Sequence, residues 1–148
     1  MNYRKIIKKV EELLGDKLSK DEKLRAICRL LVDEVEHYDW VGFYLVEKGR
    51  LVLGPYVGDA TEHTEIDFGE GICGQAADRE ETFTVQDVSL EDNYLSCSPK
   101  VRSEIVIPIF KEGKVAGELD IDSHVEEPFT DEDEKLLEDI CEEVADIL

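Results

Sequence analysis

The chain has 148 residues, the size of one domain, and 42% of them are hydrophobic, which excludes a disordered protein. Its 37 acidic residues against 17 Lys and Arg give a net charge of −20, and such a surface repels nucleic acid and anionic membranes. The N-terminus is charged and amphipathic, and no apolar run is long enough for a membrane span. We therefore expect a cytoplasmic protein without nucleic-acid or membrane partners.

The first quarter of the chain has the apolar spacing of two amphipathic helices, over about residues 3–37. Gly15 separates their two apolar stripes and is a typical helix stop. Ser19 and Glu22 have the spacing of a capping box, which predicts the start of the second helix. Cys28 falls within that helix's stripe, so we expect it in the core.

From residue 40 the hydrophobic period changes to two, which is typical of β-strands. The dipeptides Lys48-Gly49 and Glu112-Gly113 predict tight turns between paired strands. In the first strand, Trp40, Gly42 and Tyr44 share one face. The alternate residues Val41, Phe43 and Leu45 are expected to face the core. Ordinary packing and the wall of a ligand pocket are both open interpretations of the two aromatic residues.

Two cysteines lie outside the apolar stripes. Cys73 follows a glycine-rich turn in the expected first turn of a short helix, where backbone N–H groups favour a thiolate. Cys97 lies near the end of a long polar loop over residues 87–100, and such loops are often functional. No C-x-x-C pair or zinc-like histidine spacing accompanies them, so we expect reduced thiols and no metal.

Three acidic residues are expected to converge on one face of the sheet. Asp120 and Asp122 are two residues apart in a strand, so their side chains share a face, and Glu104 opens the partner strand. Because like charges raise each other's pKa, this face holds a proton or a cation, or it is solvated. One alternative is a Mg²⁺ or Ca²⁺ site, because both ions prefer oxygen ligands.

The last element is a helix over about residues 130–148, with Thr130 as its cap and Cys141 on its apolar stripe. The element order predicts one α+β domain over residues 1–148. We expect a central antiparallel sheet of five to six strands at about residues 40–123. The N- and C-terminal helices would cover one face of this sheet and a ligand pocket the other.

The motif order resembles the GAF-domain free methionine-(R)-sulfoxide reductases from Trp40 to the C-terminus. The motifs are W-V-G-F-Y, L-V-L-G-P, G-x-G-I-C-G, a loop cysteine, S-E-I-V-I-P, G-x-L-D-I-D-S and F-T-x-E-D. The resemblance implies a GAF-like fold and reduction of the R epimer of free methionine sulfoxide, without a cofactor. It also implies a homodimer and a thioredoxin-type reductant.

The resemblance assigns roles to the candidate residues. Cys97 matches the catalytic cysteine, which becomes a sulfenic acid, and Cys73 matches a cysteine able to form a disulfide with it. The residues that match the substrate pocket are its acids and its aromatic wall: Glu104, Asp120, Asp122, Trp40 and Tyr44. Family members commonly carry another cysteine upstream of Cys73, where this chain has Glu62-His63. Resolution of the sulfenic acid by Cys73 and by an external thiol are therefore both open.

Sulfoxide reduction requires a thiolate nucleophile and a proton for the departing oxygen, which one acid of the cluster would supply. The remaining carboxylates would pair with the ammonium group of a free amino acid. Two other functions are alternatives: a GAF-type sensor that binds a small molecule without chemistry, and a structural dimer module.

Overall fold

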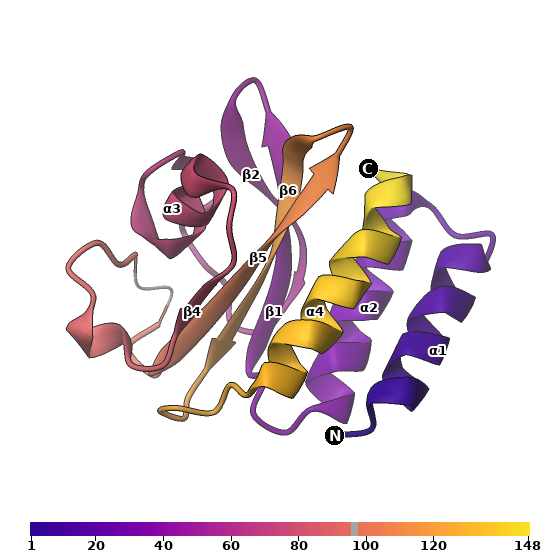
Figure 1. The fold of residues 1–148 in the computed structure, drawn as a ribbon, viewed down its shortest axis with the longest axis horizontal. Helices are drawn as coiled ribbons and strands as arrows, with labels where there is room; N and C mark the ends of the chain where they lie inside the picture. The colour runs from indigo at the N-terminus through magenta and orange to yellow at the C-terminus, as the bar shows by residue number, and fades with distance from the viewer. Residues whose placement is uncertain (96–97) are drawn as a thin grey trace.

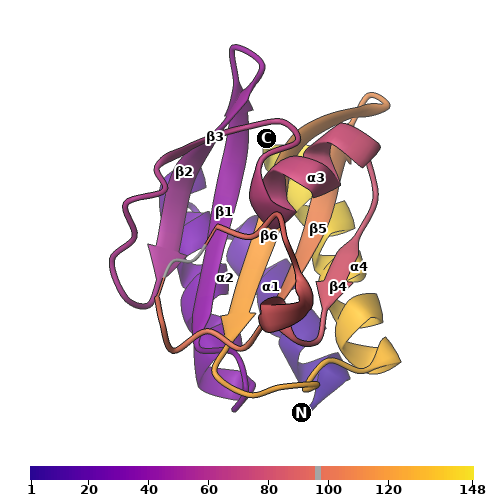
Figure 2. The same cartoon turned by 90° about the vertical axis from the view of Figure 1, so that its left-hand side faces the viewer.

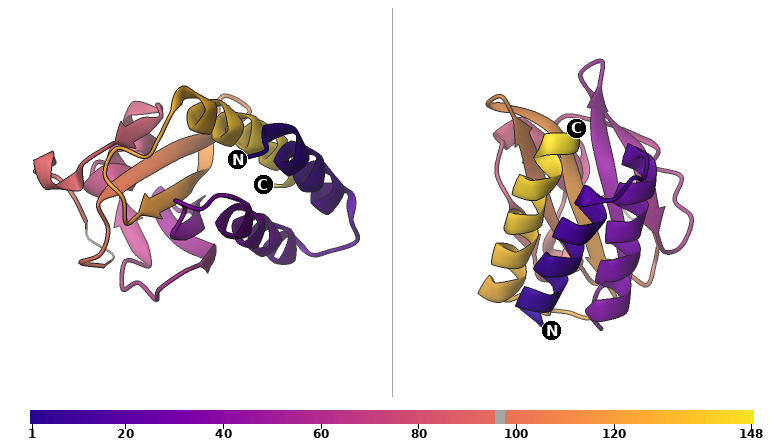
Figure 3. Two further views of the ribbon diagram at one scale, coloured as in Figure 1. Left: turned by 90° about the horizontal axis from the view of Figure 1, so that it is seen from below. Right: turned by 90° about the vertical axis from the view of Figure 1, so that its right-hand side faces the viewer.

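The computed structural model describes residues 1–95 and 98–148. Within these residues there are four α-helices: α1 (Tyr3–Gly15), α2 (Lys20–Glu34), α3 (Gly71–Arg79) and α4 (Asp131–Val144). Helices α1, α2 and α4 lie on one face of a sheet, while α3 lies on the opposite face (Figures 1 and 2). The view from below shows α1 outermost, packed over α2 and α4 (Figure 3).

Six strands form one antiparallel sheet in the order β3-β2-β1-β6-β5-β4. The strands are β1 (Trp40–Glu47), β2 (Arg50–Val57), β3 (Glu65–Asp67), β4 (Phe83–Val85), β5 (Ser103–Lys111) and β6 (Lys114–Ser123). The expected antiparallel sheet of five to six strands, with the terminal helices on one face, is confirmed. Strands β1, β6 and β5 are central and carry most of the candidate residues.

Both predicted tight turns are present. Lys48 and Gly49 have φ values of 51° and 77°, and Glu112 and Gly113 have values of 54° and 78°. Positive φ at both central residues is the pattern of a type I′ turn, whose twist matches that of the paired strands. The Lys48-Gly49 turn sets the register of β1 with β2, and the Glu112-Gly113 turn sets that of β5 with β6.

The predicted helix caps are also present, but the second helix is shorter than expected. Ser19 and Glu22 form a capping box at the start of α2. The helix ends at Glu34 rather than near His37, because Val35 has extended backbone angles (φ −121°, ψ 109°). At the other end of the chain, α4 is followed by a short 3₁₀ helix (Ala145–Ile147).

The sheet separates two groups of buried side chains. The helix-side core contains Cys28 and Cys141, which confirms their expected burial. The opposite group contains Trp40, Tyr44 and Cys73 beneath α3 and the long loop. Across the described part of the chain, none of the helices combines the length and apolar content needed to cross a membrane.

Candidate active site

The three predicted acids lie on the face of the sheet opposite the helices. Glu104 and Asp122 are direct partners in the β5–β6 ladder. Asp120 pairs with Val106 on β5 and with Gly42 on β1. The exposed fractions of the three acids are only 5%, 1% and 1% for Glu104, Asp122 and Asp120, respectively. The solvated interpretation of this face is therefore wrong, because the strands around it and α3 above it exclude water.

A fourth buried acid, Glu118, extends the row and was not among the predicted site residues. It precedes Asp120 by two residues and is fully buried between Tyr44 of β1 and Pro108 of β5. Neither carboxyl oxygen of Glu118 has a hydrogen-bond partner among the described residues. The two-residue period of β6 was the available signal, because it places residue 118 on the same face as Asp120.

Helix α3 brings the Cys73 thiol against these acids. A side chain at Gly74 would meet the carbonyl oxygen of Asp67 at 2.4 Å, so the glycine permits the close approach of the helix. Cys73 is 4% exposed, and its Sγ lies 3.9 Å from Oε2 of Glu104. One potential ligand atom from each of Cys73, Glu104 and Asp120 lies within 4.8 Å of the other two.

Burial and negative charge control ionisation in this cluster. Burial, followed by the charge of Asp120 and then of Glu104, raises the pKa of Cys73 well above its usual value. The expectation that the start of α3 favours a Cys73 thiolate is therefore wrong, because these effects outweigh the helix terminus. Burial also raises the pKa of Asp120, and burial followed by the charge of Asp120 raises that of Asp122. The raised pKa values favour the protonated forms of Cys73, Asp120 and Asp122.

The two predicted aromatic residues are held by different contacts. The Trp40 ring stacks on Tyr56, with centroids 5.3 Å apart, and its Nε1 donates to the carbonyl oxygen of Asp59 at 3.0 Å. The Tyr44 hydroxyl donates to the carbonyl oxygen of His63 at 2.9 Å. Both residues thus fix the loop after β2 against the sheet, in addition to any contact with a ligand.

The predicted residues line two small cavities rather than one. The inner cavity, about 10 Å³, is lined by Tyr44, His63, Ile66, Gly71, Ile72, Cys73, Leu95, Glu104 and Asp120. The outer cavity, about 150 Å³, is lined by Asp39, Trp40, Gly58, Asp59, Ser98, Lys100, Val101, Asp122 and His124. The inner cavity has room for one water molecule or ion, and an amino acid needs more space than that.

Cys97, the residue expected to be catalytic, lies outside the described residues. Two described residues close to it in the sequence, Leu95 and Ser98, line the two cavities. Leu95 lines the inner cavity and Ser98 lines the outer cavity.

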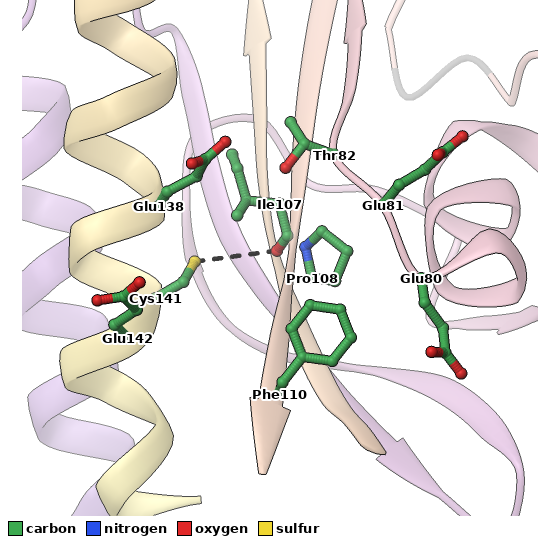
Figure 4. A pocket seen from close by; sticks show the side chains of 9 residues that line it. All are labelled: Glu80, Glu81, Thr82, Ile107, Pro108, Phe110, Glu138, Cys141 and Glu142. Carbon is green, nitrogen blue, oxygen red and sulfur yellow. Dashed lines mark hydrogen bonds between the residues drawn. The ribbon is translucent and has the colours of Figure 1, made fainter. Parts of the chain in front are cut away.

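A separate surface pocket of about 290 Å³ lies between α4, β5 and the segment after α3 (Figure 4). Its lining residues are Glu80, Glu81, Thr82, Ile107, Pro108, Phe110, Glu138, Cys141 and Glu142. The Cys141 thiol points at the carbonyl oxygen of Ile107, 3.9 Å away, and the residue is 3% exposed. None of the predicted site residues that the structure describes lines this pocket.

Comparisons with known proteins relate this chain to the GAF-domain proteins. The GAF domain family model matches residues 17–148. The free methionine-R-sulfoxide reductase of Escherichia coli K12 is 38% identical over 119 residues, which are 80% of this chain and 72% of the relative. The type II free methionine-R-sulfoxide reductase of Thermoplasma acidophilum has a TM-score of 0.84 at 38% identity, covering 86% of this chain and 91% of its own. The free methionine-R-sulfoxide reductase of Neisseria meningitidis, solved in complex with its substrate, has a TM-score of 0.92 at 33% identity, covering 98% of this chain and 87% of its own.

Proposed function

The chain belongs to the GAF-domain family and, within it, to the free methionine-R-sulfoxide reductases, and we propose that it reduces free L-methionine-(R)-sulfoxide to methionine. The observation that carries the proposal is the buried group of Cys73, Glu104 and Asp120, with Asp122 as the cross-strand partner of Glu104. Sulfoxide reduction needs thiol chemistry and a proton donor, and this group places a thiol beside carboxyl groups that favour their protonated form.

Recognition of the substrate rests on charge. The ammonium group of a free amino acid pairs with the carboxyl groups of Glu104 and Asp122, and Trp40 provides an apolar wall beside Asp122. The positive charge of the ammonium group favours the ionised form of Asp122, against the effect of burial. A methionine sulfoxide within a peptide has an amide in place of the ammonium group, and the buried carboxylates would then have no cation to balance them. This difference accounts for selectivity toward the free amino acid.

The proton for the sulfoxide oxygen comes from the acidic cluster. Burial raises the pKa of Asp120, which favours the protonated carboxyl that can donate. The Cys97 thiolate attacks the sulfoxide sulfur while this carboxyl protonates the departing oxygen. The oxygen ends on Cys97 as a sulfenic acid, methionine leaves, and the proton lost by the Cys97 thiol restores the carboxyl. Overall, one thiol and one sulfoxide give one sulfenic acid and one thioether.

Cys73 resolves the sulfenic acid in this proposal. Its raised pKa keeps it a thiol during the attack step, so Cys97 is the nucleophile and Cys73 the second partner. Condensation of the Cys73 thiol with the Cys97 sulfenic acid releases water and forms a disulfide. A thioredoxin-type dithiol then reduces this disulfide. The proposal includes one domain over residues 1–148, acting as a homodimer in the cytoplasm.

A turnover assay with the two epimers of free L-methionine sulfoxide tests the proposal. Thioredoxin, its reductase and NADPH supply electrons, and methionine formation is followed directly. We expect turnover of the R epimer only, and none in Cys97→Ser. Stoichiometric binding of the R epimer without methionine formation would instead support the sensor function, and full activity of Cys97→Ser would contradict the mechanism.

A further inference from the structure

The inner cavity combines one sulfur and two oxygen ligands in a pattern typical of a metal site. Cys73, Glu104 and Asp120 come from α3, β5 and β6, and each offers a donor atom within 4.8 Å of the other two. All three side chains are buried. Their positions in the sequence, 31 and 16 residues apart, give no hint of this grouping, which depends on the packing of α3 on the sheet.

The described lining of this cavity offers no permanent cation to its carboxyl groups. None of the described residues that line it is a Lys or an Arg. Asp120 lines this cavity, and its Oδ1 is buried and has no hydrogen-bond partner among the described residues. A buried carboxyl oxygen in this state is stabilised by a proton or by a cation, because an unpaired charge in the interior is costly.

The dimensions fit a single ion. Zinc binds cysteine sulfur at about 2.3 Å and carboxylate oxygen at about 2.0–2.2 Å, so tetrahedral sulfur and oxygen donors lie about 3.5 Å apart. The observed separation of Cys73 Sγ and Glu104 Oε2 is 3.9 Å, which small side-chain rotations close. The cavity volume of about 10 Å³ admits one ion or water molecule.

We propose that the inner cavity binds one thiophilic divalent cation of the Zn²⁺ class through Cys73, Glu104 and Asp120, in competition with the amino-acid substrate. The thiol distinguishes this site from the Mg²⁺ or Ca²⁺ site considered above, because sulfur is a poor ligand for those ions. His63, on the loop after β2, is a further lining residue of the same cavity.

Binding converts the Cys73 thiol to a zinc-bound thiolate and releases its proton, so affinity rises with pH. The metal and the sulfenic acid both require the sulfur of Cys73. Zinc therefore blocks disulfide formation, and a disulfide at Cys73 expels zinc. The metal binding stands without the proposed function, whereas the competition with substrate rests on it.

The test measures Zn²⁺ binding to reduced, metal-free protein carrying Cys97→Ser, against a chromophoric chelator. The Cys97→Ser background removes the thiol that lies outside the described residues. We expect one zinc ion per chain, and an affinity lower by roughly tenfold or more in Cys73→Ser and in Asp120→Asn. Cys141→Ala, which removes a buried thiol far from the cavity, is the matched control and binds as tightly as its parent. Equal affinity in all four proteins, or no binding, overturns the proposal.

Cobalt substitution gives a second readout that does not depend on affinity. Co²⁺ bound to a thiolate shows a charge-transfer band in the near ultraviolet, which we expect in the Cys97→Ser parent and not in Cys73→Ser. A band that persists in Cys73→Ser overturns the assignment. Sulfoxide turnover is measured separately, in the protein that keeps Cys97. If that protein shows no turnover while zinc binding and its variants behave as expected, the metal site is supported and the proposed function is contradicted. Turnover in a protein that binds no zinc contradicts the metal site alone.

Discussion

Glu118 lies directly opposite Tyr44 in the β6–β1 ladder, fully buried on the same face as the predicted acids. Burial, followed by the charge of Asp120, raises the pKa of Glu118 well above its usual value. Folding therefore favours the neutral form of this carboxyl. An apolar side chain would pack in the same place without this dependence on protonation, so Glu118 makes stability sensitive to pH.

Replacing this carboxyl tests the effect. The stabilising contribution of a raised acid pKa is fully present below the unfolded-state value of about 4.3 and is lost as pH rises through the folded-state value. We expect the melting temperature of the parent to fall more steeply than that of Glu118→Gln between weakly acidic and alkaline pH. The exposed Glu47→Gln is the matched control and keeps the parent's slope. Parallel curves for the parent and Glu118→Gln would contradict the assignment.

A change at Asp120 tests the source of the catalytic proton. In Asp120→Asn the general acid is lost, and we expect kcat/KM for the R epimer to fall by roughly 10²–10⁴-fold. The parent's rate falls as pH rises through the raised pKa of Asp120, and the variant lacks this descending limb. Asp122→Asn removes a carboxyl that lines the outer cavity instead, so it keeps the limb. The same pH profile in Asp120→Asn and the parent would exclude Asp120 as the donor.

Thiol counting tests the role of Cys73. After one equivalent of substrate without a reductant, we expect the parent to lose a pair of thiols and Cys73→Ala to lose only one. The control Cys141→Ala starts with one thiol fewer and loses the same pair as the parent. Titration of thiols in denaturant and mass spectrometry of the intact chain give the count. Loss of a pair in Cys73→Ala would assign resolution to another thiol.

The fold was largely predictable because short-range signals agree with each other. The capping box of Ser19 and Glu22 and the two type I′ turns are local chemistry, and they fix element boundaries and register. The protonation of Cys73 was not predictable in this way. Its helix position favours a thiolate, but the buried acids that oppose it come from β5 and β6 and become its neighbours only in the folded sheet.

Glu118 shows a second limit of sequence reasoning. A glutamate close to a hairpin is usually exposed, and the period of β6 gives its face but not whether that face is covered. The cover is α3, whose close approach depends on Gly74 against the backbone of Asp67. The division of the candidate residues between two cavities likewise follows from tertiary packing.

Asp133 links the start of α4 to the turn before β1, and its loss should destabilise the protein. It accepts hydrogen bonds from the Tyr38 hydroxyl at 2.5 Å and from Thr130, whose backbone N–H donates at 2.8 Å. Burial opposes ionisation, but these hydrogen bonds outweigh it and lower the pKa of Asp133. We expect Asp133→Asn to lower the free energy of unfolding at neutral pH by about 1–2 kcal/mol, whereas the exposed Asp131→Asn changes it little.

The sign of the pH dependence gives the Asp133 prediction a sharper form. A lowered folded-state pKa contributes stability above the unfolded value of about 3.9, and this contribution is lost as pH falls through the folded-state pKa. The difference between the parent and Asp133→Asn in urea unfolding should therefore shrink in strong acid. A difference that stays constant from neutral to acidic pH would show that the hydrogen-bonded charge of Asp133 is not its cause.

The Trp40 ring depends on the glycine at position 42. A Cβ at Gly42 would lie 2.4 Å from the ring of Trp40 and 2.8 Å from Cβ of Tyr56, so Gly42→Ala must displace the stacked pair. Overpacking of this kind costs about 1–3 kcal/mol, and we expect that loss in urea unfolding together with a higher KM for free methionine sulfoxide. Gly15→Ala is the matched control, because a Cβ at Gly15 meets no atom within 4 Å. If Gly42→Ala lost stability but kept the parent's KM, Trp40 would be a packing residue and not part of the substrate wall.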